Sequence, residues 1–190
     1  DAVLQAPMHA QLTQHLHALR KRLKAKWNRH VPLGSLLHDR WDLAREQGFG
    51  EGTSVYDECI VFGEVEVGQH VWVGPFTILD GAHAKLSIGD YTSIGTGCHV
   101  YTHNTIERAL TGHQAAMFTR ATRIGRCCFL SPLCIIGPGT SLGDHTFVAA
   151  GSFVQGEFPS HSFLAGNPAR RVGRVEIQDG RALLIRETAE

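Results

Sequence analysis

Residues 124–154 read IGRCCFLSPLCIIGPGTSLGDHTFVAAGSFV, and this stretch decides the fold. A large aliphatic residue returns at every sixth position, and the same period extends back to residue 55. A series of this length is far beyond chance, and it is typical of a solenoid whose short strands each turn one large residue inward. The aliphatic positions are Val55, Val61, Val67, Val73, Leu79, Ile88, Ile94, Val100, Ile124, Leu130, Ile136, Leu142, Val148 and Val154.

The positions between the aliphatic residues repeat with the same period. A glycine often follows the aliphatic residue, and a small or β-branched residue usually stands four positions after it. Four of the 5 cysteines, Cys59, Cys98, Cys128 and Cys134, fall at that small-residue position. We therefore expect them to pack as compact side chains without a catalytic role. An odd cysteine count without CxxC spacing disfavours a disulfide framework or a zinc ribbon, and it predicts a reducing, cytoplasmic location.

The six-residue series breaks twice. Three extra residues separate Leu79 from Ile88, and Val100 and Ile124 are separated by four full steps, so the register then resumes unchanged. We interpret residues 106–122 as an excursion looped out between coils. Long irregular loops in compact domains are usually functional. His83 occupies a small-residue position just before the three extra residues, and it is interpreted as a local packing irregularity and not as a ligand.

A helical head precedes the repeat. Residues 9–30 place leucines at helical spacing between basic residues, which predicts one amphipathic helix. A second helix is predicted from Ser35, as its N-cap, to Gln47. We expect three segments: a helical cap over residues 1–48, the repeat domain over 49–175 and a C-terminal extension over 176–190. The cap would cover the open end of the solenoid, while its basic run leaves open a peripheral contact with membrane lipid.

The overall charge of the chain narrows the possible partners. It carries 18 basic and 18 acidic residues, so no global field argues for nucleic acid or for an acidic polymer. No apolar run reaches the roughly 18 residues that a membrane span requires. No secretory signal is expected at the start of the chain.

The repeat pattern [LIV]-G-x-x-[STAVC]-x resembles that of the hexapeptide-repeat acyltransferases over residues 49 to about 175. The segment SIGTGCHVYTHNT (93–105) resembles the catalytic segment of the galactoside, maltose and xenobiotic O-acetyltransferases, and residues 165–170 resemble their AG-x-PA-[KR] tail. Residues 48–81 are similar to members associated with surface-polysaccharide pathways. The resemblance implies a left-handed parallel β-helix with three steps per triangular coil, assembled as a homotrimer whose active sites lie between subunits.

The same resemblance implies an acetyl-CoA-dependent O-acetyltransferase that needs no metal and acts on a sugar or glycan-precursor hydroxyl. His103 matches the family's general base. A hydroxyl is too weak an acid to attack a thioester unaided, and an imidazole, which titrates near neutrality, can take its proton. The group that orients His103 is not identifiable from the sequence.

Other site residues are also carried over from the family. The oxyanion amide is expected around Leu130 and Ser131, although the family's usual W-I-G is replaced here by Phe129-Leu130-Ser131. The excursion offers Glu107, Arg108, His113 and Gln114 to the acceptor. The residues expected to contact coenzyme A are Phe129, Ala149, Ala150, Gly151, Ser152, Ala165, Gly166, Pro168, Arg170 and Arg171.

Three other functions remain open at this point. The first is N-acetylation of an amino sugar. The second is a γ-type carbonic anhydrase, a left-handed coil that binds metal through three histidines, because His99 and His103 are four apart, a spacing that metal sites use. The third is a structural β-helix without activity.

Overall fold

A computed structural model describes residues 7–187 of the chain. The chain divides into two compact units between Asp39 and Arg40. The first unit is helical and the second contains the repeats. Each is described by itself below.

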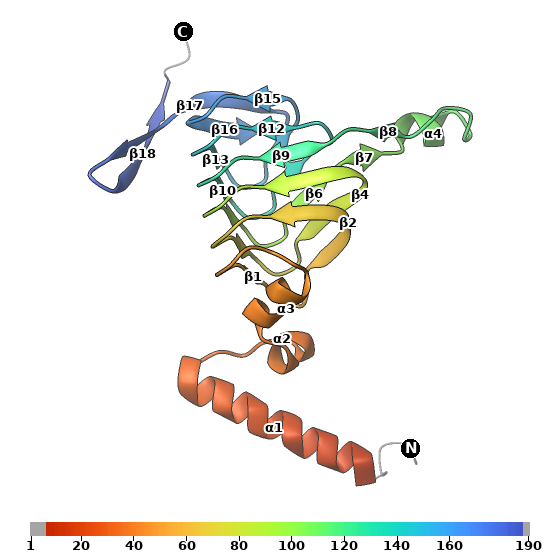
Figure 1. The fold of residues 1–190 in the computed structure, drawn as a ribbon, viewed down its shortest axis with the longest axis vertical. Coiled ribbons are helices and arrows are strands. Elements are labelled where there is room, and N and C mark those ends of the chain that lie inside the picture. The colour runs from red at the N-terminus through yellow and green to blue at the C-terminus, as the bar shows by residue number, and fades with distance from the viewer. Residues whose placement is uncertain (1–6, 188–190) are drawn as a thin grey trace. The chain divides into compact units, whose positions relative to one another are not determined.

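The second unit is a left-handed parallel β-helix, as the repeat predicts (Figure 1). Equivalent strands pair at offsets of one full coil, for example Ser54 with Trp72 and Phe129 with Phe147. The first face consists of β1 (Ser54–Val55), β3 (Trp72–Val73), β5 (Ser93–Ile94), β10 (Phe129–Leu130), β13 (Phe147–Val148) and β16 (Ser162–Gly166).

The other two faces share two long strands, β2 (Ile60–Val67) and β4 (Ile78–Ile88), which run from one face onto the next. The second face continues from the start of β4 with β6 (His99–Tyr101), β11 (Ile135–Ile136) and β14 (Phe153–Val154). The third face continues from the end of β4 with β9 (Thr122–Ile124), β12 (Ser141–Leu142) and β15 (Glu157–Phe158). The coil is therefore triangular, with three corners between three faces.

The core is the column of aliphatic residues that the period identifies. All of them are buried except Val61, which is partly buried and packs against the others. The small-residue positions turn inward as well, and their hydroxyls satisfy the backbone at the corners. Thr77, Thr140 and Thr146 each donate to the carbonyl oxygen three residues earlier, at 2.7 Å. Inward-facing polar side chains are thus paired within the coil.

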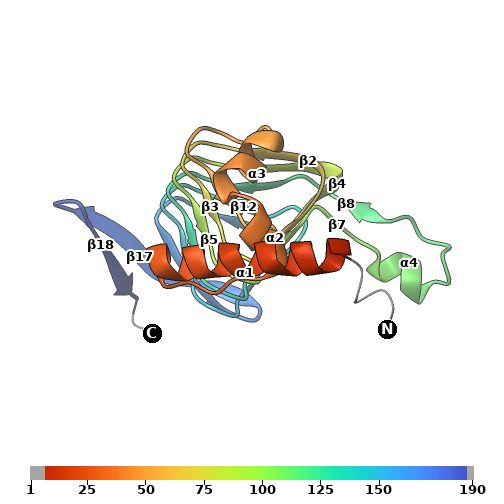
Figure 2. The same ribbon diagram turned by 90° about the horizontal axis from the view of Figure 1, so that it is seen from below.

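An arm leaves the coil between β6 and β9, at the second break (Figures 1 and 2). It comprises β7 (His103–Asn104), α4 (Ile106–Leu110) and β8 (Phe118–Thr119), and β7 pairs with β8 in antiparallel fashion. The predicted excursion is confirmed. Its base starts earlier than expected, at His103, and Thr122 already belongs to the buried coil.

A short helix, α3 (Arg40–Glu46), contacts the first strand of the coil unit. Its Ala44 is buried in the common core, and the amide of Phe49 donates to the Ala44 carbonyl at 3.0 Å. The prediction of one helix over residues 35–47 is wrong, because His38 is extended (φ −110°, ψ 134°) and separates α2 (Leu33–Leu37) from α3. Ser35 lies inside α2 and does not cap it.

The first unit contains α1 (Pro7–Trp27) and α2. The predicted long amphipathic helix is confirmed, and it ends at Trp27, ahead of Asn28 in the left-handed region (φ 48°). None of the residues of α1 is buried. Among the described residues, no helix is both long and apolar enough to cross a membrane.

The chain leaves the last coil as an antiparallel hairpin. β17 (Ala169–Gln178) turns back along β16 and then pairs with β18 (Arg181–Arg186). The expected end of the repeat domain, residue 175, falls inside β17. Figure 2 shows the hairpin and the arm leaving the coil on opposite sides.

Candidate active site

The two breaks of the repeat lie at the same corner of the coil. Leu79 pairs with Val100, and Ile88 pairs with Ile124 in the strands above. The irregular residues between Leu79 and Ile88 therefore lie one coil below the point where the arm departs. This stacking brings together side chains that are far apart in the six-residue pattern.

His103 and Asp80 meet at this corner. The Nδ1 atom of His103 lies 3.4 Å from Oδ2 of Asp80, and the two side chains are 21% and 8% exposed. The other carboxylate oxygen accepts the Ala82 amide at 3.0 Å, while the Thr102 hydroxyl donates to the Asp80 carbonyl at 2.9 Å. These contacts hold the carboxylate beneath the imidazole.

The contact between His103 and Asp80 is not yet a hydrogen bond. Nδ1 is buried, and no hydrogen-bond partner for it is found within residues 7–187, because 3.4 Å is longer than an aligned N–H···O bond. Catalytic hydrogen bonds are often long without substrate and tighten when it binds. A proton on Nδ1 is the arrangement that a neighbouring carboxylate favours, and it leaves Nε2 as the basic nitrogen.

His83 is a second imidazole at the corner. Its ring centroid lies 4.5 Å from that of His103, with an angle of 73° between the rings, and the side chain is exposed. The interpretation of His83 as a packing irregularity is therefore wrong. The extra residues of the first break lengthen β4 and direct His83 outward, beside the base of the arm.

The charge of Asp80 also affects the pKa of Tyr101, which pairs with Asp80 in the β4–β6 ladder. Burial, and then the charge of Asp80, raise the pKa of the Tyr101 hydroxyl. The same hydroxyl is 3.2 Å from Nδ1 of His99. His99 is thus engaged with Tyr101.

The four residues expected to touch the acceptor lie on the arm. Glu107 and Arg108 belong to α4, and His113 and Gln114 follow it. All four are exposed. The arm carries them outward from the coil (Figure 1).

The expected oxyanion residues lie at a different corner, where β10 turns towards β11. The Ser131 amide donates to the Val148 carbonyl at 2.9 Å. This bond belongs to the coil ladder, so the Ser131 amide is not available to an oxyanion in this arrangement, which argues against that prediction. Leu130 is fully buried, whereas Phe129 is 47% exposed and stacks on Phe147.

The residues expected to contact coenzyme A gather at this second corner. The turn at residues 149–152 lies under the start of the tail, since the Ala149 amide donates to the Leu164 carbonyl at 2.9 Å. The Gly166 amide donates to the Ser152 hydroxyl at 3.2 Å. Ala150 and Gly151 are exposed, and the surface there is nearly free of side-chain bulk.

The two arginines of the tail differ in their contacts. The Arg171 side chain donates to the Gly173 carbonyl at 3.1 Å and to Glu187 at 3.2 Å. The Arg170 guanidinium donates to its neighbouring carbonyl, Ala169, at 3.0 Å. Both residues are exposed, together with Pro168. Of the two, Arg171 is tied more firmly to the hairpin.

The cysteines have the packing role that their positions predict. Cys98, Cys128 and Cys134 are buried, and Cys59 is partly buried. Burial raises the pKa of the Cys59 and Cys128 thiols to about 11, so both are uncharged at neutral pH. Within residues 7–187 no cluster of three side chains has a geometry suited to a metal ion.

The comparisons with known proteins agree with this fold. No protein-family model matches the chain. The carnitine operon protein CaiE of Proteus sp. (strain LE138) is 30% identical over 132 residues, which are 66% of this chain and 66% of that protein. The galactoside O-acetyltransferase of Escherichia coli (strain K12) is 25% identical over 132 residues, 60% of this chain and 65% of that protein.

A hexapeptide-repeat-containing acetyltransferase from Vibrio cholerae has a TM-score of 0.63 at 24% identity, over 84% of this chain and 92% of that one. The chain belongs to the hexapeptide-repeat acyltransferase family. It covers just under two thirds of the length of the curated relatives described above. The Vibrio acetyltransferase has also been solved with acetyl-CoA, and that structure has a TM-score of 0.50 at 21% identity, over 90% and 91% of the chains.

Two residues at the corner where the arm leaves the coil are not predicted from the sequence alone. Asp80 and His83 lie in the first break, where the period offers no role for them. The signal that locates them is the offset between coils. When Leu79 is aligned with Val100, the extra residues lie directly under the segment that ends in His103.

Proposed function

We propose that this protein transfers an acetyl group from acetyl-CoA to a hydroxyl of a sugar or glycan precursor, with His103 as general base. The observation that carries the proposal is the Asp80–His103 pair at the corner where the arm leaves the coil, with Nδ1 and Oδ2 3.4 Å apart. A polar pair beside a projecting arm is an arrangement that can bind an acceptor and remove its proton.

The reaction follows from the two nitrogens of the ring. Asp80 holds the proton on Nδ1, so Nε2 takes the proton of the acceptor hydroxyl as its oxygen attacks the thioester carbonyl. The tetrahedral intermediate then collapses with cleavage of the C–S bond. The imidazolium returns its proton to the departing thiolate, which gives free coenzyme A and the acetyl ester. No covalent enzyme intermediate is needed.

The active protein is proposed to be a homotrimer. Within one chain, His103 and the small-residue turn at residues 149–152 lie at different corners of the coil. A donor bound at the second corner therefore reaches an imidazole only if a neighbouring copy presents its own His103. The exposed arm residues Glu107, Arg108, His113 and Gln114 would then complete the acceptor side.

The chemistry of the relatives supports this assignment. One curated relative is a galactoside O-acetyltransferase, and a protein of the same fold has been solved with acetyl-CoA. A sugar hydroxyl is the acceptor that the name of the galactoside enzyme indicates. We place the activity in the cytoplasm, where acetyl-CoA and glycan precursors are found together and where the free thiols of this chain persist.

A panel experiment tests the proposal. Purified protein is incubated with acetyl-CoA and sugar nucleotides, oligosaccharides or amino sugars, and both free coenzyme A and acetylated product are measured by liquid chromatography and mass spectrometry. We expect ester formation on a hydroxyl, lost in His103→Ala and kept in His99→Ala. Amide products alone would replace O-transfer by N-transfer. A trimer that binds no acetyl-CoA would overturn acyl transfer itself.

A further inference from the structure

The first helix, α1, carries charge of one sign only. Five of the 18 basic residues of the chain lie in α1, and none of its 18 acidic residues does. The basic positions are Arg20, Lys21, Arg22, Lys24 and Lys26. The balanced charge of the whole chain conceals this concentration, which makes the second half of α1 a strongly cationic surface.

The same helix carries a row of leucines that the first unit does not bury. Leu12 is 52% exposed, and Leu16, Leu19 and Leu23 are only partly covered. Trp27, at the end of the helix, is 59% exposed and lies against the Lys26 ammonium, 5.1 Å from the ring centroid. The helix therefore presents apolar and cationic groups to the same surroundings.

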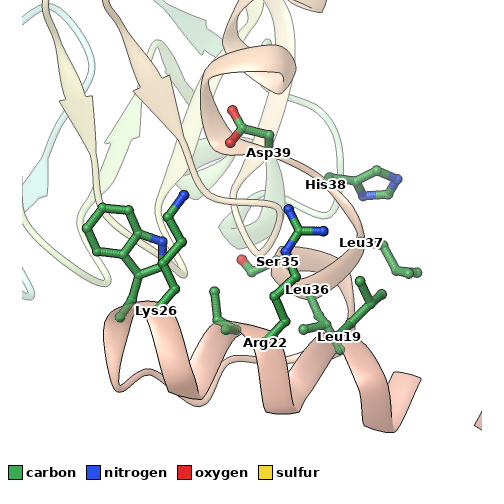
Figure 3. Close-up of a pocket in the computed structure, with 10 residues that line it drawn as sticks. Leu19, Arg22, Lys26, Ser35, Leu36, Leu37, His38 and Asp39 are labelled. Atoms are coloured by element: carbon green, nitrogen blue, oxygen red, sulfur yellow. The ribbon is translucent and has the colours of Figure 1, made fainter. Parts of the chain in front are cut away.

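A groove between α1 and α2 extends this surface. It has a volume of about 330 Å³. Figure 3 shows Leu19 and Arg22 rising from α1 towards Leu36 and Leu37 of α2. Lys26 and Trp27 also line it. Short α2 carries two more exposed leucines, Leu33 and Leu37, each 48% exposed, and Arg22 and Lys26 of α1 line the groove beside it.

Two other partners for the leucine row fit less well, namely the open end of the coil and the same helix in other copies of the chain. The role of closing the coil already belongs to α3, whose Ala44 is buried in the core of the second unit, whereas α1 has no buried residue. A bundle of identical α1 helices would bring basic flanks together with no acidic residue in the helix to offset them. It would also continue the leucine row into Lys26.

We propose that α1 binds the surface of an anionic lipid bilayer. The helix would lie in the headgroup region with the leucine row and Trp27 in contact with acyl chains, while the basic residues meet lipid phosphates and carboxylates. A helix that binds at the membrane interface combines apolar and cationic side chains in this way. A nucleic acid would use the cations alone and has no need of an exposed leucine row. This inference is independent of the proposed acetyl transfer.

The test uses the full-length protein and sedimentation with phosphatidylcholine vesicles, with and without phosphatidylserine. We expect binding only to the vesicles that contain phosphatidylserine, weakened by added salt. The double variant Leu16→Gln/Leu23→Gln should lose roughly tenfold or more in vesicle affinity for each leucine, because the apolar contact is removed. The matched control is Ala18→Gln/Ala25→Gln, which puts the same residue at exposed positions of the same helix and should bind as the wild type does.

A second variant, Lys21→Gln/Lys24→Gln, keeps the leucine row and removes two charges. It should lose about fivefold in affinity per charge. Circular dichroism of each variant checks that the helix is retained. Equal binding to neutral and anionic vesicles, or equal loss in the leucine pair and in the alanine control pair, would overturn the proposal. Binding to double-stranded DNA that survives Leu16→Gln/Leu23→Gln, without vesicle binding by the wild type, would assign α1 to nucleic acid instead.

Discussion

Two corners of the coil carry histidines, and they differ in what the imidazole rings contact. At the corner between the third and first faces, His70, Tyr91, Cys127, His145 and His161 form a column with positive φ at every member. Their rings stack, His70 on Tyr91 at 5.1 Å and His145 on His161 at 4.9 Å. At the corner of the arm, His103 instead meets Asp80 and the edge of His83.

The difference arises from the register of the coil. By position in the six-residue step, His70, His103 and His145 are equivalent, each three residues after its aliphatic residue. In the column, each amide donates to a carbonyl one coil below, as His145 does to Arg126 at 2.9 Å, and the imidazoles of His70 and His145 stack on ring neighbours. Where the repeat breaks, His103 leaves this path for β7 and faces a carboxylate. The interruption of the repeat, more than the histidine itself, marks the site.

The largest expected effect separates these two corners directly. His103→Ala should lower turnover by about 10²–10⁴, the usual cost of a lost general base, with little change in acetyl-CoA affinity. His145→Ala, at the regular corner, should keep wild-type turnover. Steady-state kinetics with the acceptor found in the panel measure both variants. Equal losses in the two variants would mean that the comparison reflects stability and not chemistry.

A smaller effect is expected when the carboxylates of the two corners are compared. Asp80→Asn should lower turnover by about 10- to 100-fold, because a hydrogen bond to a charged group contributes roughly 1.5–3 kcal/mol. Asp144→Asn is the control, since the Asp144 carboxylate accepts the Arg126 amide of the regular corner, at 3.0 Å. It should lower the free energy of unfolding and leave turnover unchanged.

Asp80→Glu sharpens this comparison. If Asp80 positions the imidazole, the longer carboxylate should restore part of the turnover and the pH dependence of the rate should move between the Asn and Glu variants. A purely structural role would change the thermal midpoint and leave the pH profile of turnover where it is.

The sequence predicts most of the coil and only part of this corner. A side chain that recurs every six residues has one inward direction, so the core from Val67 to Val154 follows from the period alone. The arm is predicted because the six-residue register is the same before and after it, at Val100 and Ile124. Asp80 and His83 are not predicted, because their role depends on which coil lies above them. The sequence also predicts α2 and α3 as one helix, because no glycine or proline between Ser35 and Gln47 marks the extended backbone at His38.

The second corner, where the turn at residues 149–152 meets the tail, is expected to contribute donor affinity instead of rate. Arg170→Ala should weaken acetyl-CoA binding by roughly 1–3 kcal/mol if its guanidinium meets a phosphate. Arg171→Ala should have the smaller effect on affinity, because Arg171 is held by Glu187 at 3.2 Å. Isothermal titration with acetyl-CoA measures both. Unchanged affinity in the double variant, with the trimer intact, would make the tail a purely structural end of the coil.

The smallest expected effect is a difference between two adjacent cysteines of the regular corner, one on its outside and one on its inside. Cys127 is a half-buried member of the column, whereas Cys128 is buried and its pKa is raised to about 11, first of all by burial. Iodoacetamide should therefore label Cys127 well before Cys128 in the native protein at neutral pH, as read by peptide mass spectrometry.

The raised pKa of Cys128 also predicts a pH effect on stability. The folded state keeps the Cys128 proton up to about pH 11, whereas the unfolded chain loses it near the ordinary thiol pKa of 9.0. Stability from this thiol is thus complete below about pH 9 and declines, by up to about 1.4 kcal/mol per pH unit, as pH rises towards 11. Denaturant unfolding of Cys128→Ala, compared with the wild type across that range, should show a shallower decline, and identical slopes would rule out this thiol as the cause.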